Sequence, residues 1–141
     1  MKNMYPKVKQ TALIGQYPAL VNSGGGLVWD EVLEYRVWCH PHNGAIDLEN
    51  CDDYYYVFAT YEEAADFSKA TKGAEEPVAL ILQKEYIDET ALNNYIHVPH
   101  ERMTEWRVDF LNRPQRTVDT IPDFLSPNAP SNRLDILRGI D

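Results

Sequence analysis

The chain has 141 residues, of which 22 are acidic and 13 basic, and its formal net charge is −9. Such an acidic chain repels a phosphate backbone unless its basic residues gather on one face, and here they are spread along the sequence. We therefore expect neither nucleic acid nor an anionic membrane surface as a partner. The length and the 44% hydrophobic residues are typical of a globular domain with its own core.

Residues 1–26 are predicted to form an irregular N-terminal arm, ahead of a single domain over 27–141. The arm ends in "VNSGGG", whose three consecutive glycines are typical of a flexible joint. The first residues lack the apolar core of a signal peptide, and no stretch has the ~18 apolar residues of a membrane span. A cytoplasmic location is therefore expected, with Cys39 and Cys51 as free thiols.

Two strands with a polar loop between them are predicted next. "LEYRVWC" (33–39) alternates in polarity, and "YYYVFAT" (54–60) is dense in aromatic and β-branched residues. The intervening "HPHNGAIDLENCDD" contains Pro, Asn-Gly and Asp-rich stretches, which resist regular structure. On the second strand Tyr55 should face away from Tyr54 and Tyr56, because successive side chains of a strand point to opposite faces.

The main helix is predicted over 61–72. "TYEE" at 60–63 is a capping box, in which the Thr60 hydroxyl accepts from the Glu63 N–H and the Glu63 carboxylate reaches back to the Thr60 N–H. Gly73 is suited to the position after the last helical turn.

Three more strands and a proline-rich tail complete the expected fold. "PVALILQ" (77–83) is almost continuously apolar, which is typical of a central strand, while "YIHV" (95–98) and "TEWRVDF" (104–110) read as shorter or half-buried strands. From about Pro114 on, prolines interrupt the chain, and "TVDTIPDFL" and "SNRLDILRG" predict short helices. The fold class is therefore α+β, with a mixed or mostly antiparallel sheet, one main helix and short C-terminal helices.

The candidate site residues lie in the loops and strands around 36–56 and 97–102. Both loops follow strands, so their side chains are expected to meet in one pocket, where aromatic faces can stack on a planar ligand. The alternative is that these residues have structural roles only: the aromatic ones as core or as an exposed strand edge, and the charged ones as a solvated surface. The ligand-binding candidates are Arg36, His42, Tyr54, Tyr56 and Arg102, and the catalytic candidates are His40, His97 and Glu101.

Metal and nucleophile chemistry are the lesser alternatives. The pairs His40-x-His42 and His97-x-x-His100, with Asp47, Asp52 or Asp53, supply ligand types that zinc or iron accepts. Both pairs flank prolines in predicted loops, where solvated histidines are common, so we expect no bound metal. Cys39 is expected to pack inward, and no GxSxG motif occurs.

Five segments of the chain resemble a small family of bacterial proteins of about this length, often labelled GNAT-type acetyltransferases. They are "GLVWDEVLEYRVWCHP", "DDYYYVFATYEEAADFS", "GAEEPVALILQKEYIDE" and "NRPQRTVDTIPDFL" with "SNRLDILRG". The label implies acetyl-CoA, held by a Q/R-x-x-G-x-G/A loop at a helix start. The nearest segment, "ATKGAE" at 70–75, has Ala70 and Glu75 at the key positions and follows a helix, so the motif does not support the label.

The order of "YRVW", "YVFATYEEAADFS", "PVALILQ" and "TEWRVDFL" also resembles ADP-ribosyltransferase-like folds. That resemblance implies NAD as cofactor, with Arg36 or His40 helping to hold it and Glu101 as a catalytic carboxylate.

Two functions follow from the sequence. The first is a binding domain for a ligand or a protein, without a cofactor or a catalytic motif of its own. Its apolar C-terminal turns, with Leu134, Ile136, Leu137 and Ile140, are candidates for docking on the domain or on a second copy in a homodimer. The alternative is a transferase that uses acetyl-CoA or NAD.

Overall fold

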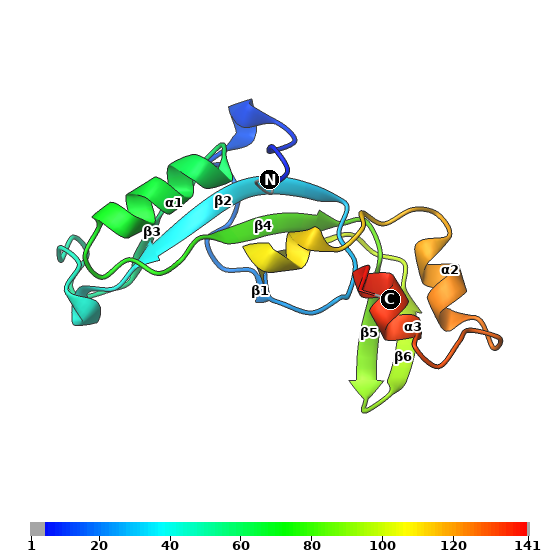
Figure 1. Ribbon diagram of the computed structural model, residues 1–141. Coiled ribbons are helices and arrows are strands. Elements are labelled where there is room, and N and C mark those ends of the chain that lie inside the picture. Colours follow the sequence, from blue (N-terminus) through cyan, green and yellow to red (C-terminus); the bar gives the residue numbers. More distant parts are fainter. Residues whose placement is uncertain (1–4, 141) are drawn as a thin grey trace. The chain divides into compact units, whose positions relative to one another are not determined.

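The computed structural model describes residues 5–140, so the first four residues of the predicted 1–26 arm lie outside the described part. The described chain is α+β, as predicted, with one main helix and a mixed sheet (Figure 1). The strand order is β1-β7-β4-β2-β3 in the larger sheet, and β5 and β6 form a separate pair. Within the larger sheet, β1 and β7 pair in parallel, whereas β2 and β3 pair antiparallel.

The strands are β1 (Asn22–Ser23), β2 (Glu31–Cys39), β3 (Tyr54–Phe58), β4 (Val78–Gln83), β5 (Tyr86–Ala91), β6 (Asn94–Val98) and β7 (Arg102–Arg107). The helices are α1 (Tyr61–Ala70), α2 (Thr120–Leu125) and α3 (Arg133–Arg138), with short 3₁₀ turns at Thr11–Leu13, Pro41–Asn43 and Val108–Asn112. Two compact units can be distinguished. Unit 1 contains residues 5–20 and 32–80, and unit 2 contains 21–31 and 81–140. No helix within residues 5–140 is both long and apolar enough to cross a membrane.

Unit 1 is built on the two predicted strands around the polar loop. They are β2 and β3, which pair with Trp38 opposite Tyr55. Tyr56 and Phe58 of β3 pack on Phe67 of α1, with ring centroids 5.0 and 5.4 Å apart respectively. Figure 1 shows α1 lying along β3. Tyr55 therefore faces away from the helix, which confirms the predicted alternation.

The start of α1 follows the predicted capping box in its main feature. The Glu63 N–H donates to the Thr60 hydroxyl over 3.2 Å, and that hydroxyl donates to the Glu63 carboxylate over 3.1 Å. Because Thr60 is the cap, β3 ends at Phe58, before the predicted boundary.

The end of α1 differs from the prediction. The helix ends at Ala70, because Thr71 already has an extended backbone. Gly73 is therefore not the residue that terminates the helix. Its φ of +82° and a close approach to Ala45 explain the glycine, since an added Cβ would lie 2.3 Å from the Ala45 nitrogen.

Unit 2 contains two strands that the sequence did not predict. One is the two-residue β1, which lies inside the arm 1–26 that was predicted to be irregular. The predicted strand at 95–98 is β6, and its partner β5 was missed because "YIDETA" carries two acidic residues and is mostly exposed. β7 is also shorter than the predicted 104–110. Thr104 and Trp106 are buried as one face of the strand, but Val108 and Phe110 belong to a 3₁₀ turn.

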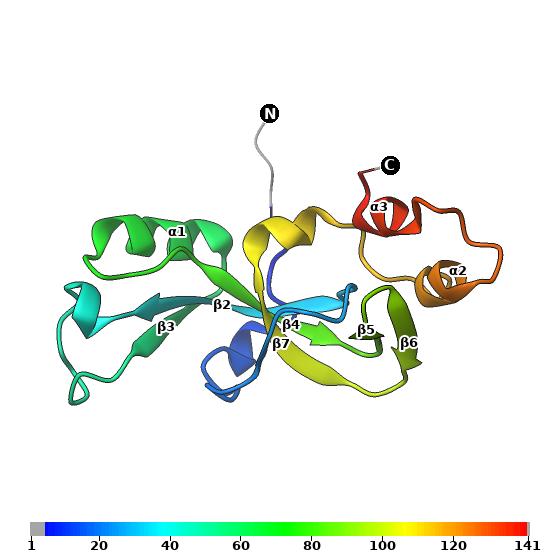
Figure 2. The same cartoon turned by 90° about the horizontal axis from the view of Figure 1, so that it is seen from below.

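The C-terminal helices pack beside the β5–β6 hairpin, as Figure 2 shows. The core of unit 2 consists of Val28, Ile87, Ile121, Phe124 and Leu137, and Leu134 packs against it. Docking of the tail on the domain is thus confirmed for two of its predicted residues. Ile136 and Ile140 are exposed.

Candidate functional site

A buried ion pair ties the N-terminal arm to β2. Glu34 and Arg36 are both fully buried, and the Arg36 Nε donates to the Glu34 carboxylate over 2.7 Å. The Arg36 guanidinium also donates to the carbonyl oxygens of Pro18 and Ala19, over 2.5 and 3.3 Å. The second Glu34 oxygen accepts from the Gly15 N–H over 2.9 Å. Arg36, predicted from the sequence to bind a ligand, is thus engaged with the protein's own groups.

A cavity of about 560 Å³ lies next to this ion pair in unit 1. We call it the Trp38 cavity. Its lining residues are Ala19, Leu20, Trp38, Glu49, Asp52, Asp53, Tyr54 and Tyr55. The Trp38 and Tyr55 ring centroids are 4.7 Å apart, and the Arg36 guanidinium lies 4.6 Å from the Tyr55 ring centroid.

The loop that carries the acidic wall of the Trp38 cavity has its own hydrogen bonds. The Asp47 carboxylate accepts from the Cys51 N–H over 2.7 Å, and Asn50 and Cys51 both have positive φ. The Tyr54 hydroxyl donates to the Ile46 carbonyl oxygen over 2.6 Å. These contacts fix the chain on both sides of Glu49, so the cavity's acidic wall has a defined backbone.

Neither cysteine has the properties of a nucleophile. Both thiols are free; Cys39 is buried, as predicted, and Cys51 is exposed. Burial raises the pKa of the Cys39 thiol. The hydrogen bond from the Cys51 thiol to the Asp47 carboxylate raises the pKa of Cys51. A raised pKa lowers the fraction of reactive thiolate, so neither side chain is activated for attack.

His40 is held between two carboxylates. Its Nδ1 lies 2.8 Å from the Asp53 carboxylate, and its Nε2 is hydrogen-bonded to Glu75. Because both partners favour the charged imidazolium, first Asp53 and then Glu75, the pKa of His40 is raised. The clamp joins the end of β2, the acidic loop and the segment after α1.

The His40 clamp predicts a pH dependence of stability. The pKa of His40 is raised on folding, so its stabilisation is complete below about pH 6.5, the ordinary pKa of histidine, and is lost as the pH rises through the folded-state pKa. We expect His40→Gln to reduce the loss of unfolding free energy between about pH 6 and about pH 8. Urea denaturation at both pH values measures this, with the exposed His42→Gln as the control. An unchanged pH dependence in His40→Gln would contradict the clamp.

The other histidines that were metal candidates have different surroundings. His42 lies exposed in the turn Pro41–Asn43 and His100 is exposed, whereas His97 Nε2 lies 2.5 Å from the Glu85 carboxylate. Among residues 5–140 no group of three or more His, Cys, Asp or Glu side chains is placed to hold a metal ion.

The candidates of the 97–102 segment belong to unit 2, whereas His40 and His42 belong to unit 1. Glu101 is exposed. The Arg102 Nε donates to the buried Gln83 over 2.6 Å, and its guanidinium lies 4.1 Å from the Tyr86 ring centroid. A pocket shared by the two groups of candidates stays a prediction.

Buried donors hold the glycine run of unit 2. Gly24, Gly25 and Gly26 have φ values of +75°, +82° and +84°. The Gly25 carbonyl oxygen accepts from Gln83 over 3.0 Å and from the Trp106 indole over 2.9 Å. A cavity of about 360 Å³ beside this run is lined in part by Arg102, Asp88 and Glu89, so it too contains carboxylates.

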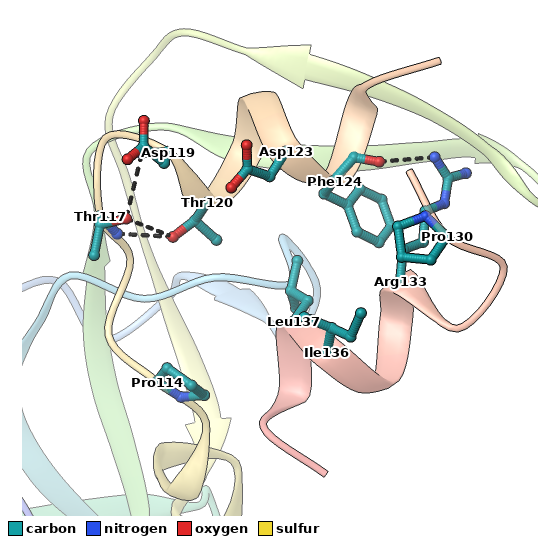
Figure 3. Close-up of a pocket in the computed structure, with 10 residues that line it drawn as sticks. All are labelled: Pro114, Thr117, Asp119, Thr120, Asp123, Phe124, Pro130, Arg133, Ile136 and Leu137. Carbon is teal, nitrogen blue, oxygen red and sulfur yellow. Dashed lines mark hydrogen bonds between the residues drawn. The ribbon is translucent and has the colours of Figure 1, made fainter. Parts of the chain in front are cut away.

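A third cavity, of about 240 Å³, lies between α2, α3 and the segment before them (Figure 3). We call it the Phe124 cavity. Its lining residues are Pro114, Thr117, Asp119, Thr120, Asp123, Phe124, Pro130, Arg133, Ile136 and Leu137. No sequence pattern singles out this cavity, because its polar and apolar sides come from two short helices whose packing is a tertiary feature.

Three aromatic residues line the Trp38 cavity, and the sequence analysis missed two of them, Trp38 and Tyr55. Tyr54 and Tyr56 were the predicted ligand platform. Tyr54 lines the cavity and donates its hydroxyl to the Ile46 carbonyl oxygen, whereas Tyr56 packs on Phe67. Tyr55, on the opposite face, has Trp38 as its cross-strand partner. The alternation of side chains along β2 and β3 indicates which face each residue occupies. It does not indicate the register that pairs Trp38 with Tyr55, because register depends on both strands.

The structure does not test the acetyltransferase or the ADP-ribosyltransferase-like activity that the sequence resemblances imply. Both activities therefore stay predictions. Comparison of the chain with protein-family models, with curated proteins and with solved structures finds no match.

Proposed function

We propose that unit 1 is a binding domain that receives the basic side chain of a protein partner, Lys or Arg, in the Trp38 cavity. The observation that carries the proposal is the combination of an aromatic pair, Trp38 and Tyr55, with three carboxylates in one cavity. Aromatic faces attract cations through the ring quadrupole, most strongly for Trp, and nearby carboxylates add direct charge attraction.

The charges of the cavity favour a cation over a phosphate-bearing cofactor. Glu49, Asp52 and Asp53 line it. His40 pairs with Asp53, and the Arg36 guanidinium is directed at Glu34 and at backbone carbonyl oxygens. Glu49 and Asp52 remain to attract a cation. Acetyl-CoA and NAD carry pyrophosphate groups that such a wall repels, so the transferase alternative has less support from this cavity than the binding function has.

Exposed apolar residues near the cavity favour a protein partner over a free amine. Leu20, which lines the cavity, is 90% exposed. Ile46 and Leu48, in the loop that carries Glu49, are 73% and 57% exposed. Apolar side chains beside an aromatic pair and charged groups are the composition of a protein interface, where Trp, Tyr and Arg contribute most of the binding energy.

The test uses N-acetylated Gly-Arg-Gly amide and its neutral citrulline counterpart as probes, titrated into the isotope-labelled chain and followed by NMR. We expect the arginine peptide to shift the resonances of Trp38, Tyr55 and Asp52, and the citrulline peptide to bind more weakly. Trp38→Ala should lower the affinity for the arginine peptide about five-fold, because an exposed cation–π contact contributes roughly 1 kcal/mol.

Matched variants separate the cavity from general charge effects. Tyr56→Ala changes the same strand on its opposite face, and Asp66→Asn removes a carboxylate from α1, outside the cavity. Both should bind the arginine peptide as the parent does, whereas Asp52→Asn should bind it less well. Equal binding of the arginine and citrulline peptides would refute the proposal.

A further inference from the structure

The Phe124 cavity of unit 2 has one polar and one apolar side. Figure 3 shows Asp119, Asp123 and Thr120 on one side of the opening and Ile136 and Leu137 across from them. Phe124 and Leu137 are 3% and 9% exposed, so they form part of the core of unit 2 and a fixed apolar floor.

The polar groups of the cavity divide into those with partners and those without. The Thr117 and Thr120 hydroxyls lie 3.2 Å apart, and Thr120 also accepts from the Thr117 N–H over 2.8 Å. Within residues 5–140, by contrast, the carboxylates of Asp119 and Asp123 have no hydrogen-bond or ion-pair partner. The cavity therefore contains two uncompensated negative charges.

Among the described residues, Arg133 is the one cationic side chain that lines the cavity, and it has partners of its own. The Arg133 guanidinium donates to the Phe124 carbonyl oxygen over 2.8 Å and lies 4.5 Å from the Phe124 ring centroid. It also lies 5.1 Å from the Tyr95 ring centroid. Asp119 is the N-cap residue of α2 and Asp123 lies in its first turn, so their spacing of four residues places both carboxylates on one side of the helix start.

We propose that the Phe124 cavity binds a small amphipathic amine, with its ammonium group at Asp119 and Asp123 and its hydrocarbon body on Phe124 and Leu137. The volume of about 240 Å³ lies below the range of ~300–1,000 Å³ that is usual for drug-sized ligands, so the ligand is a compact one. The apolar floor distinguishes such an amine from a hydrated divalent cation, which prefers a cage of oxygen ligands. This site is independent of the Trp38 cavity.

The test titrates n-hexylamine, 1-hexanol and hexanoate into the full isotope-labelled chain and follows the backbone amides by NMR. Hexylamine should shift the amides of 117–124 and 136–137. Its affinity should exceed that of hexanol about five-fold, the effect of one partly exposed ion pair, and hexanoate should bind most weakly. Hexylamine shifts confined to Trp38, Glu49 and Asp52 would overturn the assignment to this cavity.

Charge-neutral variants test the role of the two carboxylates. Asp123→Asn and Asp119→Asn preserve shape, and each should reduce the affinity for hexylamine toward that for hexanol while leaving hexanol binding unchanged. Asp135→Asn, which neutralises a carboxylate of α3 outside the cavity, is the matched control and should bind hexylamine as the parent does. Equal hexylamine binding by Asp123→Asn and the parent, or equal shifts on adding Ca²⁺ alone, would overturn the proposal.

Discussion

Arg36→Met is expected to lower the free energy of unfolding by about 3–5 kcal/mol, because it leaves the Glu34 carboxylate as an uncompensated charge in the interior. Both side chains are fully buried, and their contact of 2.7 Å is a charge-assisted hydrogen bond. The carbonyl oxygens of Pro18 and Ala19 lose donors in the same variant. Urea denaturation, with the midpoint and the slope fitted separately, measures the loss.

Two further variants show whether the cost comes from burial. Arg107→Met breaks the ion pair between Arg107 and Asp109, which are 74% and 49% exposed, and should change the unfolding free energy by less than about 1 kcal/mol. In the double variant Glu34→Leu/Arg36→Met neither charge of this pair remains, so much of the lost stability should return. If Arg36→Met lowered the unfolding free energy no more than Arg107→Met does, burial of the Glu34–Arg36 pair would not have the predicted effect on stability.

The buried pair also positions one wall of the Trp38 cavity. Ala19 and Leu20 line that cavity, and the bonds from Arg36 to the carbonyls of residues 18 and 19 hold this part of the arm. Arg36 lies against Tyr55 as well. A polar pair inside unit 1 therefore connects the stability of the arm to the geometry of the proposed binding site.

Gly73→Ala is expected to destabilise the protein by about 2–5 kcal/mol, the sum of the cost of a left-handed backbone and the cost of overpacking. The φ of Gly73 is +82°, and a Cβ there would lie 2.3 Å from the Ala45 nitrogen and 2.8 Å from the Ala45 Cβ. The nearest atom belongs to backbone, so no rotation of a side chain relieves the contact. The loop that contains Ala45 and the segment after α1 would have to move apart.

Gly24→Ala is the matched control for this effect. Gly24 has a similar φ of +75°, but a Cβ there would meet nothing within 4 Å. It should therefore cost only the backbone contribution of about 1–2 kcal/mol. The difference between the two variants, measured by urea denaturation, isolates the close approach to Ala45. Equal costs would show that backbone conformation alone explains the glycine.

Local patterns were sufficient for most of the elements. The capping box placed the start of α1 correctly, because its hydrogen bond joins residues only three apart. The continuous apolar run of 78–82 identified β4 as a central strand. The alternation of 54–56 placed Tyr55 opposite its neighbours. In each case the signal lies within a few residues, so the sequence by itself determined the α+β class and the order of the main helix and five of the seven strands.

Tertiary structure decided what these elements bring together. β5 forms on an exposed acidic segment because β6 supplies its hydrogen-bond partners, and Gly73 is required by Ala45, which lies far from it in the sequence. The aromatic pair of the Trp38 cavity depends on the β2–β3 register, and the Phe124 cavity depends on how α2 packs on α3. Contacts between distant residues have no local sequence pattern. For that reason the sequence analysis named polar candidates around 36–56 and 97–102 but did not predict either cavity.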